Sequence, residues 1–264
     1  MDLPLIYAYP VLGALVIAMT LNFVAYVIAF LAQTDKLTDL TYSLSFIAIA
    51  VWVQFAYTSD HWSKLLIAAL PILWALRLGS YLFFRILKKG RDYRFDEMRP
   101  VWWRFGGFWL LQAISVWIIS LPYVQALCSR QHIHVERVWL LAPGLLIFIT
   151  GMIIEAVADH QKSRFRSRPE NAGQFISTGL YKKIRYPNYL GEMLIWIGIY
   201  LTCLPYFSTA GMYLTIISPL WIIFLLIKIS GIPYLEKSQH QRYGGLDSYK
   251  QYVSKTHRLL PGIY

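Results

Sequence analysis

The residues best suited to chemistry follow a short basic loop. Arg185 precedes Pro187, and Asn188 and Glu192 then open an apolar run that carries no further charge before Leu204. Proline fits the first turn of a helix, so Asn188 and Glu192 are predicted to lie one turn apart on one face. A glutamate facing lipid would be very costly. We therefore expect Glu192 to face protein, water or a ligand, or else to lie at the membrane interface paired with Arg185.

A second set of charges ends the preceding apolar run. Glu155, Asp159, Lys162 and Arg166 are separated by four, three and four residues and share one helical face, with Arg164 close by. This face is either a stripe of salt bridges or a surface for the ribose and phosphates of a nucleotide, since arginine suits phosphate. The chain has neither a GxGxxG motif after a strand nor a Walker loop. Any nucleotide site is therefore not of the soluble Rossmann or P-loop type.

Other candidates lie in the first and last thirds of the chain. Asp39, Tyr42, Gln54 and Tyr81 are polar residues in or beside apolar runs, and Arg77 needs Asp39, a ligand or a polar cavity as its partner.

Tyr234 and Glu236 follow the last apolar run. The basic tail that contains them either lies on the membrane surface or closes over the helix of Asn188 and Glu192. The two cysteines and the scattered histidines predict no disulfide framework and no metal site.

Hydrophobic content of 57% and aromatic content of 16% in 264 residues are too high for a soluble domain. The sequence predicts an all-α polytopic membrane protein with about seven spans, each needing roughly 20 apolar residues. The expected spans are Pro4–Leu31, Thr41–Tyr57, Leu65–Leu87, Phe105–Leu121, Val138–Ala158, Tyr189–Tyr206 and Ala210–Ile229.

The net charge of +11 is concentrated after the third span, after the fifth span and in the tail. Seven spans place these three regions on one side, which predicts an outside N-terminus and a cytoplasmic C-terminus. This topology explains the basic charge without nucleic acid, so membrane lipids are the expected surroundings. The oligomeric state does not follow from the sequence.

Three segments carry a family resemblance. Thr178-Gly179-Leu180-Tyr181, the segment from Arg185 to Glu192 and the segment from Ser230 to Lys237 resemble a bacterial membrane family of unknown function. That family is related to the C-terminal domain of steroid 5α-reductases. The resemblance implies a seven-helix reductase in the bacterial inner membrane, which takes NADPH from the cytoplasmic side.

The resemblance also implies one integral-membrane domain over residues 1–264. Its residues 1–121 would enclose a lipophilic substrate, and residues 138–264 would hold the cofactor. By position, the residues that match cofactor-binding residues of the steroid enzymes are Glu155, Asp159, Arg166, Asn188, Glu192 and Tyr234.

Two positions depart from the steroid enzymes. Phe55 and Trp74 stand nearest to the Glu and Tyr that polarise the enone carbonyl in those enzymes. An enolate that develops after hydride transfer needs a hydrogen-bond donor. We therefore expect that donor among the four polar residues of the first half, namely Asp39, Tyr42, Gln54 and Tyr81.

The favoured hypothesis is a membrane oxidoreductase that reduces a conjugated double bond of a steroid-, terpenoid- or lipid-like substrate with NADPH. Arg164, Arg166 and Arg185 would meet the phosphates, while Tyr234 and Glu236 would form a lid. The pattern Arg-x-Pro-x-Tyr-x-Gly from Arg185 to Gly191 also resembles isoprenylcysteine carboxyl methyltransferases and phospholipid methyltransferases. Two alternatives therefore stay open, a methyltransferase that uses S-adenosylmethionine (SAM) and a lipid-binding or scaffold protein without enzymatic activity.

Overall fold

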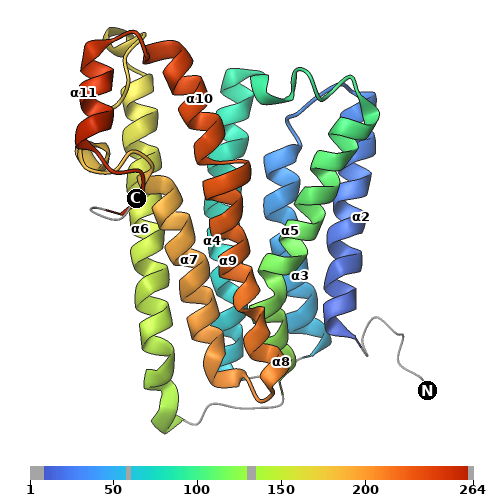
Figure 1. Ribbon diagram of the computed structural model, residues 1–264. Helices are drawn as coiled ribbons and strands as arrows, with labels where there is room; N and C mark the ends of the chain where they lie inside the picture. The colour runs from blue at the N-terminus through green and yellow to red at the C-terminus, as the bar shows by residue number, and fades with distance from the viewer. Residues whose placement is uncertain (1–8, 58–60, 130–134, 261–264) are drawn as a thin grey trace. The chain divides into compact units, whose positions relative to one another are not determined.

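The structure is a computed structural model that describes residues 9–57, 61–129 and 135–260 (Figure 1). Within these residues, seven helical segments are long and apolar enough to cross a membrane. The principal helices are α2 (Pro10–Leu31), α3 (Thr38–Ala56), α4 (Trp62–Lys89), α5 (Trp102–Cys128), α6 (Ala142–Arg166), α7 (Pro187–Cys203), α9 (Ile217–Phe224), α10 (Ile232–Tyr243) and α11 (Asp247–Lys255). The all-α polytopic class is confirmed, whereas the orientation of the termini stays a prediction.

Two of the long helices extend well beyond the apolar segments that predicted them. Helix α6 continues past Ala158 to Arg166, and α5 continues past Leu121 to Cys128. Helical hydrogen bonding does not stop where hydropathy falls, so an apolar window underestimates helix length. Residues 4–8 of the first expected span lie outside the described residues.

The chain packs as two compact units. Unit 1 comprises Met1–Leu141 and Ile199–Ser218, and unit 2 comprises Ala142–Gly198 and Pro219–Tyr264. Helix α7 therefore contributes its first part to unit 2 and its last residues to unit 1. The expected division into residues 1–121 and 138–264 stays a prediction about function.

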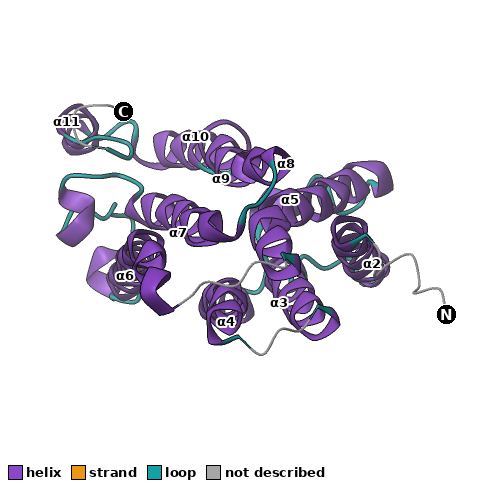
Figure 2. Cartoon of the chain, turned by 90° about the horizontal axis from the view of Figure 1, so that it is seen from below, coloured by secondary structure: helices purple, strands orange, loops and turns teal. Residues whose placement is uncertain are grey.

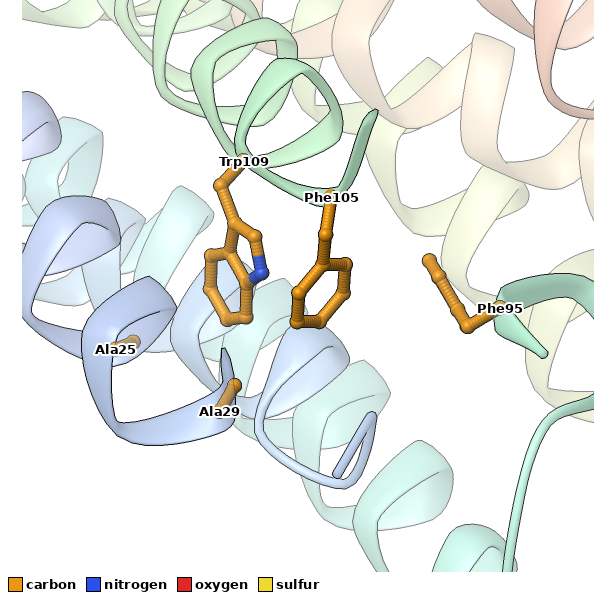
Figure 3. Close-up of a cluster of buried hydrophobic side chains, with 5 residues drawn as sticks. All are labelled: Ala25, Ala29, Phe95, Phe105 and Trp109. Carbon is orange, nitrogen blue, oxygen red and sulfur yellow. The ribbon is translucent and has the colours of Figure 1, made fainter. Parts of the chain in front are cut away.

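In unit 1, α3 packs against each of α2, α4 and α5 (Figure 2). Helix α2 buries one face of small residues, Ala14, Ala18, Ala25 and Ala29, which lets large side chains of α5 approach its backbone. Figure 3 shows Ala25 and Ala29 beside Phe105 and Trp109, with Phe95 on the far side of Phe105. The opposite face of α2 carries exposed apolar side chains such as Phe23 and Ile28, as expected for a helix in contact with lipid.

A buried polar network lies within unit 1. Gln112 Nε2 of α5 donates to Asn22 Oδ1 of α2 at 2.8 Å and to the carbonyl of Thr38 at 3.2 Å. Asn22 Nδ2 donates to Ser45 Oγ of α3 at 3.3 Å. Polar residues in a membrane interior usually pair between helices in this way, so the network fixes how α2, α3 and α5 meet.

Unit 2 is built from α6, the first part of α7 and the segment from α9 to α11. The π-helical turn η7 (Leu225–Ile229) separates α9 from α10. Gly231 follows it, and a Cβ there would lie 2.9 Å from the Cα of Leu226. Only glycine permits this close backbone approach, so the break in the last span is determined locally.

Candidate functional site

The site begins with a contact between the backbones of α6 and α7 in unit 2. A Cβ on Gly151 would lie 2.7 Å from the carbonyl oxygen of Gly191, and a Cβ on Gly198 would lie 2.5 Å from the amide nitrogen of Phe148. Small residues let two membrane helices approach this closely. A Cβ on Gly191 would in turn lie 2.7 Å from the Cβ of Glu155. The contact therefore places Glu155 beside the first turns of α7.

Three carboxylates of unit 2 are buried near this contact. Glu155, Asp159 and Glu192 are only 2%, 6% and 9% exposed. Glu155 and Asp159 lie one turn apart on α6, and Glu192 lies one turn after Asn188 on α7, as the spacing predicted. Burial of three acidic side chains is expensive and is typical of a site that binds a polar group.

Asn188 supplies a spare hydrogen-bonding atom. Its Oδ1 is completely buried and accepts no hydrogen bond from the described residues. Pro187 is the first residue of α7, as the sequence predicted, so Asn188 stands in the opening turn of the helix. A buried amide oxygen of this kind costs about 1–3 kcal/mol unless a water or a ligand satisfies it.

The loop before α7 is fastened to the end of α6. Gly179 has φ +62°, and a Cβ there would collide with the side chain of Gln161. The amide N–H of Leu180 donates to Gln161 Oε1 at 2.9 Å, and the hydroxyl of Tyr181 donates to the carbonyl of Ala158 at 3.3 Å. Glycine is required at position 179 because its left-handed backbone conformation and the lack of space beside Gln161 each exclude a side chain.

The tail is joined to the same loop through its backbone. Ile184 and His257 form a parallel bridge, the N–H of Arg185 donates to the carbonyl of His257 at 2.8 Å, and the N–H of Tyr186 donates to that of Arg258 at 3.1 Å. The tail is thus part of unit 2 and lies against the start of α7.

Glu236 joins these segments by ion pairs. It accepts two hydrogen bonds of 2.8 Å from Arg258 and lies 3.5 Å from the guanidinium of Arg185. Arg185 also donates to the carbonyls of Thr256 at 2.5 Å and Val253 at 3.1 Å. The alternative pairing of Arg185 with Glu192 is therefore wrong, because the guanidinium of Arg185 is directed to the tail.

The remaining cofactor candidates are more open. Arg164 and Arg166 are exposed in the last turn of α6, where a phosphate could reach them. Tyr234 is partly exposed in the first turn of α10, two residues before Glu236. Their roles, like that of Arg185 as a phosphate ligand, stay predictions.

In unit 1 the four candidates for the polarising group fall into two places. Asp39 Oδ2 lies 3.6 Å from Arg85 Nη2, and the Arg85 guanidinium lies 5.8 Å from the ring centre of Tyr81. Tyr42, one turn after Asp39, meets Trp74 edge to face at 6.1 Å. Gln54 is fifteen residues after Asp39 on α3, which is about 22 Å along the helix. Gln54 and Asp39 therefore cannot act on the same carbonyl.

The positions that differ from the steroid enzymes also differ in surroundings. Trp74 is fully buried and packs edge to face on Phe46 at 5.2 Å, whereas Phe55 is 77% exposed. The side chain at position 55 lies on the outer surface of the protein. The difference from the steroid enzymes at this position therefore changes that surface.

Sequence reasoning missed Tyr186. Its ring is 1% exposed and its hydroxyl has no hydrogen-bond partner among the described residues. Burial raises the pKa of its phenol above the ordinary value, and the negative charge of Glu236 adds to this effect. The only signal in the sequence was its position between Arg185 and Pro187, and nothing local shows that the side chain is buried.

Comparison with known proteins assigns the chain to a family. Residues 25–256 match the family described as "Protein of unknown function (DUF1295)", and the chain belongs to this family. The resemblance to this family drawn from the segments around Thr178, Arg185 and Ser230 is thereby confirmed, whereas the bacterial origin stays a prediction.

Relatives of two enzyme types are found among curated proteins. The chain is 34% identical over 62 residues to steroid 5-alpha-reductase DET2 of Arabidopsis thaliana, which covers 23% of each chain. It is 24% identical over 145 residues to 3-oxo-5-alpha-steroid 4-dehydrogenase 1 of Rattus norvegicus, covering 53% of this chain and 50% of the rat protein. It is also 36% identical over 56 residues to the probable O-methyltransferase ustE of Ustilaginoidea virens, covering 21% of this chain and 19% of the fungal protein.

The matched regions cover between 19% and 50% of the lengths of these curated relatives. No solved structure matches the chain. The chain is thus a distant homologue of the steroid 5-alpha-reductases.

Proposed function

We propose that this protein is a membrane oxidoreductase that transfers hydride from NADPH to a conjugated carbon–carbon double bond of a steroid-, terpenoid- or lipid-like substrate. The observation that carries the proposal is the Oδ1 atom of Asn188, which is buried without a hydrogen-bond partner among the described residues, one helix turn before buried Glu192. The distant homology to steroid 5-alpha-reductases supports this function.

The residues of unit 2 suit the parts of NADPH. Asn188 can bind an amide or a hydroxyl, and the carboxylates of Glu155, Asp159 and Glu192 can accept hydrogen bonds from ribose hydroxyls. Arg164 and Arg166 are exposed cations at the end of α6, and arginine is suited to phosphates. The cofactor supplies the hydride when bound, and the protein contributes orientation and the exclusion of water.

Arg185 would contribute indirectly in this proposal. Its guanidinium already binds Glu236 and two tail carbonyls. It would therefore hold the tail, with Tyr234 and Glu236, against the start of α7, and its own contact with phosphate would require these bonds to open. The lid proposed for Tyr234 and Glu236 thus belongs to the tail segment that Arg185 binds.

The polarising donor is proposed among Asp39, Tyr42 and Tyr81. These residues lie towards the same end of the α3 and α4 pair, whereas Gln54 lies about 22 Å along α3 from Asp39. A tyrosine hydroxyl can donate directly to a carbonyl oxygen, and Asp39 can do so only when protonated. Gln54 remains a candidate for contact with another part of a long substrate.

Purified full-length protein in detergent provides the test. Thermal unfolding is measured with NADPH, NADH and SAM in parallel, for the wild type, Glu192→Gln and the control Glu97→Gln, which alters an exposed residue in the loop before α5. A ligand at a hundred times its Kd should stabilise the wild type and the control by about 2.7 kcal/mol. We expect stabilisation by NADPH that is reduced in Glu192→Gln. An unchanged response in that variant, or no response of the wild type to NADPH, would contradict the proposal.

A second candidate is a methyltransferase that uses SAM and acts on a lipid or a lipidated substrate. The match to the probable O-methyltransferase ustE supports it, as does the pattern from Arg185 to Gly191. Stabilisation by SAM alone in the same experiment would select this function. The longer match to the rat steroid enzyme favours the reductase.

The seven apolar helices fit an integral membrane protein. We propose the bacterial inner membrane as its location, with the C-terminus and the cofactor site on the cytoplasmic side, because the basic loops should remain inside. Labelling of single cysteines introduced at Lys250 and at Tyr9 in intact cells would test this orientation.

A further inference from the structure

A groove of about 320 Å³ lies between α2 and α5 of unit 1, two helices that stand side by side (Figures 1 and 2). None of the candidate site residues lines it. Phe23 of α2 and Leu110 of α5 are among its lining residues and are both exposed, so the groove opens to the outside of the unit. The other lining residues include Met19, Tyr26, Gly106 and Ala113.

The polar groups of this groove are turned to the protein. Asn22 belongs to the buried network of unit 1, and the Tyr26 hydroxyl donates to the carbonyl of Trp102 at 3.0 Å. Trp109 Nε1 has no hydrogen-bond partner among the described residues, but it lies on the side of the Phe105 ring, which the indole meets edge to face at 5.9 Å (Figure 3). The groove thus offers apolar surface, which suits a hydrocarbon chain.

The groove runs from the membrane interface into one leaflet of the bilayer. Trp102 and Trp103, at the start of α5, are both exposed, and tryptophans at span ends sit at the level of the lipid headgroups. Gly106 follows one turn after Trp102, and Ala113 follows about 16 Å after it along the helix. The hydrocarbon core is about 30 Å thick, so this depth matches one acyl chain of a lipid.

The interfacial end of the groove is positively charged. The segment from Lys88 to Arg104 carries six basic and three acidic residues. Arg104 is exposed two residues before Gly106, and its guanidinium lies 5.1 Å from the ring centre of Trp103. In the described part of the chain Arg104 forms no ion pair with a carboxylate. This charge at the headgroup level is complementary to an anionic lipid.

We propose that the groove binds one anionic phospholipid of the surrounding membrane, with an acyl chain between α2 and α5 and the phosphate beside Arg104. Gly106 leaves room for the chain, because a Cβ there would be in ordinary contact with the Tyr26 ring at 3.5 Å and a longer side chain would enter the groove. The bound lipid contacts both helices and so stabilises unit 1. This site does not depend on the proposed oxidoreductase function.

Native mass spectrometry of delipidated full-length protein provides the test. The probes are dioleoyl phosphatidylglycerol, which is anionic, and dioleoyl phosphatidylcholine, which has the same chains and no net charge. Gly106→Leu fills the groove, and Gly107→Leu is its matched control, because nothing lies within 4 Å of a Cβ at position 107. Arg104→Gln removes the charge at the interface, and Arg104→Lys retains it.

We expect the wild type to bind one phosphatidylglycerol more tightly than phosphatidylcholine. Gly106→Leu should lose this binding, whereas Gly107→Leu should keep it. Arg104→Gln should weaken the preference for phosphatidylglycerol about fivefold, the usual effect of one cation near a lipid surface, and Arg104→Lys should retain most of it.

Equal affinities of the wild type for the two lipids would overturn the proposal, and so would equal losses in the two glycine variants. An unchanged preference in Arg104→Gln would overturn the position of the phosphate. If Gly106→Leu lowers the Tm of the lipid-free protein, Phe23→Ala decides, because it removes an exposed wall of the groove and leaves the core filled. Phe23→Ala should weaken phosphatidylglycerol binding, and an unchanged affinity would overturn the acyl-chain site.

Discussion

Gly151 of α6 and Gly191 of α7 approach so closely that a Cβ on either residue would lie within 2.8 Å of the carbonyl oxygen of the other. The obstacles are main-chain atoms of helices, which cannot move individually. This contact positions Glu155 beside the opening turns of α7, so the integrity of the candidate site depends on two residues without side chains.

Gly191→Ala should therefore destabilise the protein. The added methyl group would overlap Glu155 and the carbonyl of Gly151, and overpacking of this kind costs about 1–3 kcal/mol. Gly107→Ala in α5 is the matched control, because nothing lies within 4 Å of its Cβ position and alanine favours a helix. Thermal unfolding in detergent should show a lower Tm for Gly191→Ala and an equal or higher Tm for Gly107→Ala. Equal behaviour of the two variants would contradict the close contact.

Asp92 should contribute stability that is lost in acid. Burial alone would raise the pKa of its carboxyl, but hydrogen bonds from Arg94 and the charges of Arg94 and Lys89 outweigh burial, so the pKa lies below its usual value of about 3.9. A depressed pKa gives stability that is present above pH 4 and disappears as the pH falls through the folded-state value.

The measurement for Asp92 is the difference in Tm between the wild type and Asp92→Asn across pH. We expect a positive difference at pH 7 that shrinks below about pH 4 as the carboxyl of the wild type takes up its proton. A difference that stays constant down to pH 3 would mean that the Arg94 pair contributes no net stability.

The ion pairs of Glu236 should hold the tail against the start of α7. Glu236→Gln and Arg258→Gln are each expected to increase hydrogen exchange in residues 247–258 while the exchange of α6 stays unchanged. The coupling energy in a double-mutant cycle should be about 1 kcal/mol, because the pair is bidentate but partly open to solvent. It should fall as salt is raised. Additive single variants would show that the backbone bridge at His257 is sufficient.

Lys64 should be a structural residue at the start of α4. Its Nζ donates to the carbonyls of Leu127 and Ser129 at 3.1 and 2.5 Å, and so it joins α4 to the end of α5. Lys64→Met keeps the length of the side chain but leaves these carbonyls without their donor, at a cost of about 1–3 kcal/mol. Lys88→Met, an exposed substitution in the last turn of the same helix, should leave the Tm nearly unchanged. A similar Tm for both variants would refute the role of Lys64.

Much of the architecture was predictable from local properties. Seven apolar runs predicted the seven segments, and Pro187 correctly marked the first residue of α7. The spacing of Glu155 and Asp159 correctly placed them on one helix, where both are buried. Hydropathy and the helical period act over a few residues, so they can be read without knowing which helices meet.

The partners of the charged residues could not be read in this way. Arg185 binds Glu236, which is 51 residues away, and the phenol of Tyr186 is enclosed where loop, helix and tail meet. The sequence suggested Arg77 as a partner of Asp39. Asp39 instead lies beside Arg85, which is about two helical turns after Arg77 on α4.

The sequence by itself thus determined the membrane class, the helices and the family, because apolar length and motif spacing are properties of short segments. The tertiary structure alone decided that glycines bring α6 and α7 together and that Arg185 binds the tail. It also decided that Tyr186 and Asn188 bury polar atoms that have no hydrogen-bond partner within residues 9–57, 61–129 and 135–260. These features depend on which surfaces come into contact, and that follows from packing across segments far apart in the chain.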